Sequence, residues 1–165
     1  MKKIGLLSDT HSYLDPKIFE YFEHCDEIWH AGDFGNASVS ESLSAFKPLR
    51  GVYGNVDGQD IRQLHKEAIS FDCEGVKVLM IHIGGYPSKY SFKAKEYIDM
   101  KNPGLFICGH SHILKVMHDS HRPKMLHINP GAAGNEGFHQ VRTAVRFDID
   151  EGIIGKLEVI ELGKR

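Results

Sequence analysis

Short apolar runs alternate with polar loops along this chain, and helical patterns separate the first of them. A short apolar run that ends in polar or glycine residues is typical of a buried strand. Apolar residues at helical spacing predict a helix that begins near Pro16, and two further helices at 38–46 and 90–100. The runs predict strands at 2–8, 27–30, 49–53, 69–72, 76–82 and 105–108.

The last third of the chain contains strand patterns without helices between them. Strands are predicted at 115–118, 125–128, 143–149 and 156–160. Glu74-Gly75 and Asp150-Glu151-Gly152 are turn sequences, so the strands on either side of each are expected to form hairpins. So many strands would not fit the edge of one sheet. We therefore predict an α/β fold with two sheets packed face to face and helices outside.

Length, composition and charge set ordinary limits. No repeat or linker divides the chain, and 165 residues with 41% hydrophobic content predict one domain over 1–165. The net charge of -2 gives no basic surface for nucleic acid, and no apolar stretch is long enough to cross a membrane. The apolar run after Met1 is too short for a signal peptide, and Cys25, Cys73 and Cys108 are not closely spaced. A cytoplasmic protein with reduced thiols is expected.

Polar residues with metal-binding side chains follow five of the predicted strands. In layered α/β folds, loops at the carboxyl ends of strands gather in one crevice, so these residues should converge. Mixed oxygen and nitrogen ligands suit borderline divalent metals, and two ions sharing one carboxylate form a centre for in-line displacement at phosphorus. The candidate ligands are Asp9, His11, Asp33, Asn55, His82, His110 and His112.

Each of these residues also has an ordinary structural explanation when it is taken alone. Asp9, Asp33 and Asn55 could cap helices or form turns, and His82 could be a core histidine. Their joint occurrence after successive strands is what predicts a metal centre. The remaining residues singled out here have structural interpretations. Trp29 and His30 are predicted in the core, Lys93, Lys95 and Lys101 on a solvated helix face, and most of His24, His65, His118, His121, His127 and His139 in solvent.

The order of the motifs resembles the calcineurin-like metallophosphoesterases, especially their small prokaryotic single-domain phosphodiesterases. The series is Asp9-x-His11, Gly32-Asp33, Gly54-Asn55-x-Asp57, His82, Gly109-His110-x-His112 and Asn129-Pro130-Gly131. One such motif is weak, but all of the metal motifs in order are specific. The resemblance implies a four-layer α/β/β/α sandwich of two mixed sheets flanked by helices.

The resemblance also implies a role for each ligand. Asp9, His11 and His112 would hold one metal ion, and Asn55, His82 and His110 the other. Asp33 would bridge the ions together with a water or hydroxide that attacks phosphorus, so the catalytic set is Asp33, Asn55, His82 and His110. Two divalent transition-metal ions are expected, with manganese first and iron, nickel, cobalt or zinc as alternatives. Asp57 is expected to orient the ligands.

Departures from the wider family point to a phosphodiesterase that acts on a small phosphodiester. In the protein-phosphatase branch, a proton-donating histidine follows the asparagine ligand, and this chain has Val56 at that position. That branch also has a phosphate-binding arginine after the bridging aspartate, and no arginine follows Asp33 here. His139 is a candidate proton donor, and Arg142 a candidate substitute for the arginine. Ile81 replaces a glycine found before the lone histidine in many relatives, with little consequence because His82 remains.

Three alternatives remain open. The protein could be a broad phosphomonoesterase. It could also be a non-catalytic scaffold like the retromer subunit that resembles this family, although that subunit has lost part of its metal set and this chain keeps all seven positions. A metal-dependent nuclease would favour a longer chain with a basic face. Whether the protein forms a homo-oligomer is not indicated.

Overall fold

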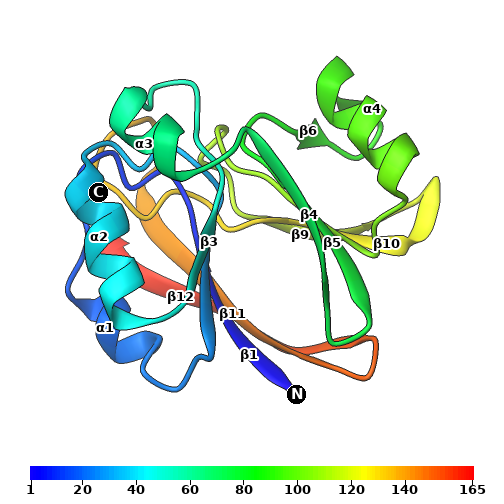
Figure 1. Ribbon diagram of the computed structural model, residues 1–165, viewed down its shortest axis with the longest axis horizontal. Coiled ribbons are helices and arrows are strands. Elements are labelled where there is room, and N and C mark those ends of the chain that lie inside the picture. Colours follow the sequence, from blue (N-terminus) through cyan, green and yellow to red (C-terminus); the bar gives the residue numbers. More distant parts are fainter.

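Two five-stranded sheets pack face to face in the computed structural model, which describes residues 1–165 (Figure 1). The first sheet has the order β12-β11-β1-β2-β3, and the second has the order β4-β5-β8-β10-β9. In the first, β1, β2 and β3 run parallel, while β11 lies between β1 and β12 and pairs antiparallel with both. In the second, β5, β8 and β10 run parallel while β4 and β9 are antiparallel. Both sheets are therefore mixed, as predicted.

The elements have the following bounds. The first sheet contains β1 (Lys2–Leu7), β2 (Glu27–His30), β3 (Leu49–Gly51), β11 (Val141–Asp150) and β12 (Ile153–Lys164). The second contains β4 (Ala68–Cys73), β5 (Val76–Ile81), β8 (Leu105–Ile107), β9 (Lys115–Asp119) and β10 (Arg122–Asn129). A small hairpin is formed by β6 (Gly85–Tyr86) and β7 (Lys89–Tyr90). The helices are α1 (Lys17–Tyr21), α2 (Ala37–Phe46), α3 (Gln59–Leu64) and α4 (Phe92–Lys101). No helix is long and apolar enough to cross a membrane.

Three separate apolar clusters hold these layers together. The largest lies between the sheets and joins residues such as Leu6 and Phe147 of the first sheet to Met80 and Ile107 of the second. The other two clusters lie between each sheet and its helices. One packs α1, α2 and α3 on the first sheet, and the other packs α4 on the second. Three apolar interfaces require four layers, so the α/β/β/α prediction is confirmed.

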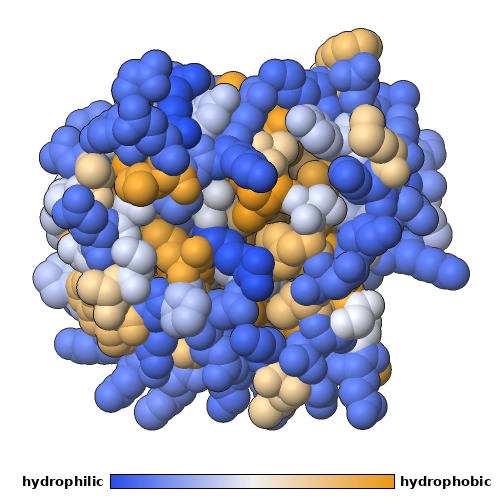
Figure 2. Space-filling view, in the orientation of Figure 1, coloured by the Kyte–Doolittle hydropathy of each residue, from blue (hydrophilic) through white to orange (hydrophobic).

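The apolar runs arise because the central strands are buried on both faces. In β5, Val78 and Met80 point to the other sheet, while Leu79 and Ile81 pack with the residues under α4. In β1, Gly5 faces α1, where an added Cβ would lie 2.6 Å from the ring of Phe22. The face of the molecule shown in Figure 2 is mostly hydrophilic, with hydrophobic residues gathered near its centre.

Both predicted hairpins are present, and their turns meet. Glu74 and Gly75 have φ angles of 46° and 85°, and Glu151 and Gly152 have 47° and 82°. Two successive positive φ angles are the pattern of a type I′ turn, which matches the twist of the strands. The backbone N–H of Gly152 donates to the carbonyl of Glu74 at 2.7 Å. The hairpin of one sheet thus contacts the hairpin of the other.

Some elements differ from those predicted. Helix α3 and the β6–β7 hairpin were not predicted, while β10 and β12 are longer than expected and β3 is shorter. Helix α3 buries Ile61 alone and leaves Leu64 exposed, so it has no apolar period to detect. The strands of the small hairpin have two residues each, which is too short for an alternating pattern.

A buried carboxylate connects the first three strands. Glu27 accepts hydrogen bonds from Arg50 Nε at 2.8 Å, Trp29 Nε1 at 3.0 Å and Lys2 Nζ at 3.0 Å. Burial by itself would raise the pKa of Glu27, but these donors outweigh it and lower the pKa from 4.5 to about 2. Trp29 is fully buried, as predicted.

Glu27→Gln should therefore change how stability depends on pH. Because the folded pKa lies below the unfolded value, the contribution is fully present above about pH 5 and is lost as the pH falls towards about 2. The substitution should lower the free energy of unfolding at neutral pH by about 1–3 kcal/mol and should flatten its decline in acid. Urea unfolding at a series of pH values measures this. Glu20→Gln, at an exposed position, is the control, and equal pH profiles for the two variants would contradict the argument.

Candidate metal centre

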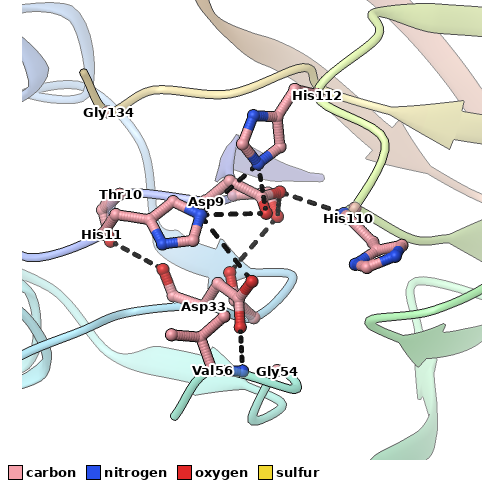
Figure 3. A network of polar contacts seen from close by, with 12 residues as sticks. Asp9, Thr10, His11, Asp33, Gly54, Val56, His110, His112 and Gly134 are labelled. Carbon is pink, nitrogen blue, oxygen red and sulfur yellow. Dashed lines mark hydrogen bonds and ion pairs between the residues drawn. The ribbon is translucent and has the colours of Figure 1, made fainter. Parts of the chain in front are cut away.

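All seven predicted ligands lie at one edge of the two sheets. Figure 3 shows Asp9, His11, Asp33, His110 and His112 of this set. Asp9 and His11 follow β1, Asp33 follows β2, and Asn55 follows β3 in the first sheet. The other three come from the second sheet, where His82 follows β5 and the loop with His110 and His112 follows β8. Every one of these strands runs parallel to a neighbour, so their carboxyl ends meet at the same edge. The predicted convergence is confirmed.

Six of the seven side chains form two groups with metal-ligand geometry. In the first group, Asp9, His11 and His112 place one ligand atom each within 4.8 Å of one another, and Asp9 Oδ1 lies 3.1 Å from His112 Nε2. The second group, made by Asp33, His82 and His110, meets the same limit. Each group therefore takes side chains from both sheets.

Asp33 and Asn55 complete the arrangement. Asp33 Oδ2 lies 3.1 Å from His82 Nε2 in its own group and 3.7 Å from His11 Nε2 in the other. A ligand shared by two ions needs such an intermediate position. Asn55 Oδ1 lies 3.0 Å from His110 Nδ1, so its side chain adjoins the second group.

Each carboxylate has one oxygen bound by protein donors and one directed into the centre. Asp9 Oδ2 accepts hydrogen bonds from Ser8 Oγ at 2.6 Å and from the His110 backbone N–H at 3.1 Å. Asp33 Oδ1 accepts one from the backbone N–H of Val56 at 3.0 Å. Asp9 Oδ1 is buried and has no hydrogen-bond partner. A buried unpaired carboxylate oxygen is costly, and a cation would satisfy it.

The ring of His82 is oriented in the same way. Its Nδ1–H donates to the carbonyl of Ala31 at 2.7 Å, which leaves the lone pair on Nε2 for the centre. Nε2 is buried and also has no hydrogen-bond partner. Metal-binding histidines commonly donate their second N–H to a carbonyl in this way. The two unpaired atoms, Asp9 Oδ1 and His82 Nε2, thus fit a bound cation.

The charges of the site support the same interpretation. Burial opposes ionisation of Asp9, but the imidazoles of His11 and His112, whose Nε2 atoms lie 3.6 and 3.1 Å from Oδ1, outweigh it and hold the pKa of Asp9 well below its ordinary value. Burial likewise opposes protonation of His82, but the carboxylate of Asp33, with Oδ2 3.1 Å from His82 Nε2, outweighs this and raises the pKa of His82. Two buried carboxylates therefore require positive charge beside them. The raised pKa values of His11 and His82 favour their protonated forms beside these carboxylates, and divalent ions would supply positive charge in their place.

The backbone at the centre adopts an unusual conformation. Five of the seven candidate ligands have left-handed φ angles: Asp9 (54°), His11 (45°), Asp33 (57°), His110 (70°) and His112 (61°). This conformation costs a residue with a side chain roughly 1–2 kcal/mol, and such residues cluster at functional sites. Position 54 requires glycine for a steric reason, because a Cβ there would lie 2.0 Å from Asp33 Oδ1.

Residues behind the ligands hold the loops in place. Asp57, predicted to orient the site, accepts hydrogen bonds from the backbone N–H groups of Phe34, Gly35 and Gly54 at 2.9–3.2 Å. It therefore ties the Asp33 loop to the Asn55 loop. Asn129 does the same for the histidine loop, because its Nδ2 donates to the carbonyl of Gly109 at 2.9 Å. The role of Asn129 was not predicted, although Asn129-Pro130-Gly131 is one of the motifs that carry the family resemblance.

His30 contacts the residues on either side of Asp33. Its ring stacks on Phe34 with centroids 3.6 Å apart, and its Nδ1 accepts the backbone N–H of Gly32 at 3.1 Å. Burial lowers the pKa of His30 to about 3, so the ring is neutral. Its predicted place in the core is confirmed.

The predictions for several residues outside the motifs need correction. His127 is buried beside Phe106, and burial lowers its pKa to about 4. His65 is half-buried and stacks on Phe34. Imidazole packs well against aromatic rings, so the expectation that these two are solvated was wrong. Arg142 does not enter the site, because its guanidinium is buried in an ion pair with Asp15 at 2.6 Å.

His139 lies close to the centre. Its ring centroid is 5.1 Å from that of His112, and its Nε2–H donates to the carbonyl of Gly134 at 2.8 Å. Nδ1 is buried and has no partner. A ring held in this state accepts a proton at Nδ1, and its predicted role as proton donor stays a prediction.

Comparison with known proteins identifies the family. The calcineurin-like phosphoesterase superfamily domain matches residues 1–152. The chain belongs to the calcineurin-like phosphoesterase superfamily. A relative from Methanothermobacter thermautotrophicus, a probable metallophosphoesterase, is 27% identical over 137 residues, which cover 78% of this chain and 76% of the relative. The family resemblance noted in the sequence is therefore confirmed.

Solved structures share the fold of this superfamily member. One is a novel archaeal phosphodiesterase, with a TM-score of 0.74 and 24% identity over 96% of this chain and 99% of the other. Another is the Vps29 protein of Entamoeba histolytica in complex with Zn²⁺, with a TM-score of 0.71 and 17% identity over 98% of this chain and 99% of the other. At these identities the likeness establishes the four-layer fold.

Proposed function

We propose that this superfamily member is a phosphodiesterase with two divalent metal ions in its centre. The observation that carries the proposal is the arrangement of two ligand groups around the buried carboxylate of Asp33. Asp9, His11 and His112 would hold one ion, and Asn55, His82 and His110 the other, with Asp33 shared. Manganese is expected first, with iron, nickel, cobalt and zinc as alternatives, because histidine and carboxylate ligands suit all of these metals.

The residues of the chain would hold the metal ions with ligands that are fixed in position and shielded from water. Asp9 and Asp33 are 0% and 2% exposed, so their negative charges act on bound cations with little screening by water. The left-handed loops and the hydrogen bonds from Val56 and Ser8 hold the carboxylates in place. Two bound ions would supply a nucleophilic water of lowered pKa and the positive charge that stabilises a pentacoordinate phosphorus.

A phosphodiester fits the site better than a phosphomonoester. Val56 takes the place of a histidine that could protonate a poor leaving group, and Arg142 is committed to Asp15. A singly charged diester with a reasonable leaving group needs no strong general acid, and it needs fewer cationic contacts than a doubly charged monoester. The fold shared with an archaeal phosphodiesterase adds support at the level of fold alone.

A non-catalytic scaffold is the second candidate, since Vps29 proteins share the fold. The unpaired Asp9 Oδ1 and His82 Nε2 favour the metalloenzyme over the scaffold. A scaffold has no chemical need for two buried, unpaired metal-ligating atoms. A small phosphodiester is accordingly the proposed partner.

Metal analysis combined with kinetics tests the proposal. We expect two ions per chain after metal-free protein is reloaded with manganese. The kcat/KM for bis(p-nitrophenyl) phosphate should exceed that for p-nitrophenyl phosphate by about tenfold or more, equivalent to ~1.4 kcal/mol in transition-state binding. Reloading with iron, nickel, cobalt and zinc compares the metals.

Three results would count against the proposal. A limit of one ion per chain at saturating metal would contradict the two-metal centre. A clear preference for the monoester would contradict the substrate class and favour the phosphomonoesterase alternative. Metal binding without hydrolysis of either ester, under every metal condition, would favour the scaffold.

A further inference from the structure

A cleft opens beside the second ligand group, between α3 and α4. These two helices stand on opposite sides of the sheet edge that carries the ligands (Figure 1). The cleft has a volume of about 380 Å³, and Asn55 and His82 line it together with Arg62, Glu67 and Lys93. A substrate whose phosphorus lies at the metal centre would therefore place one substituent in this cleft. The size is adequate for an aryl or nucleoside-sized group.

The guanidinium of Arg62 is held in a fixed orientation within the cleft. Its Nε donates to the backbone carbonyl of Asp57 at 2.7 Å, and its Cζ lies 4.4 Å from the ring centroid of Tyr53. The hydrogen bond and the cation–π contact together restrain the planar group. Both Nη groups lack a hydrogen-bond partner in the protein. Two parallel donors therefore remain available to an oxyanion.

Arg62 has no carboxylate partner, unlike every other arginine of the chain except the terminal Arg165. The guanidinium groups of Arg50, Arg122, Arg142 and Arg146 each pair with an aspartate or glutamate. Lys93, the other cation of the cleft, is neutralised by Glu67 at 2.7 Å. Lys93 is exposed, as predicted for a solvated helix face, and it also lines the cleft. Of the two cations that line the cleft, Arg62 is the one whose charge no carboxylate balances.

We propose that Arg62 is a substrate-binding residue, which donates its two free Nη groups to an anionic oxygen of the phosphodiester. The inference rests on the proposed function, and it assigns to α3 the phosphate-binding arginine that is missing after Asp33. The remaining lining, which includes Tyr53 and the exposed Ile83, would contact the apolar part of the substituent. The oxygen could belong to the scissile phosphate or to a second acidic group on the substituent, and suitable substrates distinguish the two.

Three variants test this role. Arg62→Ala removes the donors, and Arg62→Lys keeps the charge while losing the planar pair of donors. Lys95→Ala is the matched control, because Lys95 is an exposed cation of α4 that pairs with Asp99 and does not line the cleft. Metal content and thermal unfolding are measured for each variant, since Arg62 is not a metal ligand and its loss should leave two ions bound.

The decisive measurements use inorganic phosphate and two diesters. Calorimetry on manganese-loaded protein gives the dissociation constant for inorganic phosphate. The substrates are bis(p-nitrophenyl) phosphate and its analogue in which a carboxylate replaces one nitro group. Because a charged hydrogen-bond pair is at stake, Arg62→Ala should lower kcat/KM by roughly 10- to 100-fold. Arg62→Lys should restore part of the loss, and Lys95→Ala should behave as the unaltered protein.

Each outcome has a defined meaning. Equal losses on both diesters with weaker phosphate binding place Arg62 on the scissile phosphate. A loss confined to the carboxylate analogue, with phosphate binding unchanged, places it on the substituent. Unchanged kinetics and phosphate binding would overturn the inference, as would a loss that follows lowered metal content and is not relieved by lysine. If the unaltered protein hydrolyses neither diester, weaker phosphate binding by Arg62→Ala still supports the anion site, while the phosphodiesterase proposal fails. If the unaltered protein hydrolyses neither diester and Arg62→Ala leaves phosphate binding unchanged, both the anion site and the phosphodiesterase proposal fail.

Discussion

Asp33→Asn is expected to leave the protein folded but to lower its metal content and its phosphoesterase turnover together. The asparagine oxygen can still accept the N–H of Val56, which Asp33 Oδ1 accepts at 3.0 Å. The amide nitrogen would replace Oδ2, which faces His82 in one ligand group and His11 in the other. An amide N–H₂ cannot bind a cation. Because both ions would lose the same ligand, we expect both sites to weaken and turnover to fall by roughly 10²–10³ or more.

Metal analysis at a series of metal concentrations, together with circular dichroism and kinetics, measures the effect. Asp72→Asn is the control, since Asp72 is an exposed aspartate of β4, away from the centre. Metal-free Asp33→Asn should still unfold cooperatively but at less denaturant than the unaltered protein, because the amide removes the carboxylate that lies 3.1 Å from His82 Nε2. Retention of two ions and of near-normal turnover would rule out the shared-ligand assignment of Asp33.

His82→Asn should instead remove one ion and retain the other. His82 belongs to the group of Asp33 and His110, and its Nε2 is the buried unpaired atom of that group. Asparagine is too short to reach the same position, whereas Asp9, His11 and His112 are untouched. We expect about one ion per chain, and turnover should fall by roughly 10² or more because both ions act on the phosphoryl group. Loss of the bond to the Ala31 carbonyl should lower the free energy of unfolding by about 1–3 kcal/mol.

His127→Asn provides a matched comparison for burial. His127 is a fully buried histidine of β10 in the second sheet, and it belongs to neither ligand group. Its substitution should reduce stability while leaving two ions and normal turnover. If His82→Asn kept two ions and near-normal turnover, His82 would be a core histidine and the second ligand group would be wrongly composed.

The sequence predicted the convergence of the ligands because each polar cluster directly follows an apolar run. Asp9, Asp33 and His82 all lie within three residues after the end of a buried strand, and parallel strands present these positions at one edge. Two sheets with helices outside were predicted because the strand patterns of the last third would not fit the edge of one sheet, and the family resemblance added the four-layer order. Strand-rich sequence at the end of the chain supplied the antiparallel partners.

Other features depend on contacts that no local pattern encodes. The left-handed φ angles of His110 and His112 belong to a loop that is held by hydrogen bonds to Asp9 and from Asn129, both distant in sequence. Arg62 was not singled out because α3 has no apolar period, and its free guanidinium is recognisable only when the partners of the other arginines are known. His65 shows the same limit, because its burial depends on Phe34, which is distant in sequence.

The origin of each ligand group from both sheets links metal binding to the free energy of folding. A cation held by Asp9 and His112, or by Asp33 and His82, is bound fully only when the two sheets are packed in register. Ligands that bind the folded state alone stabilise it by mass action, by about 2.7 kcal/mol per site at a hundredfold excess over the dissociation constant. The hairpin turns meet through Glu74 and Gly152 without any metal. Under the proposed assignment, metal availability would therefore set how long the protein survives unfolding and proteolysis, as well as how fast it turns over substrate.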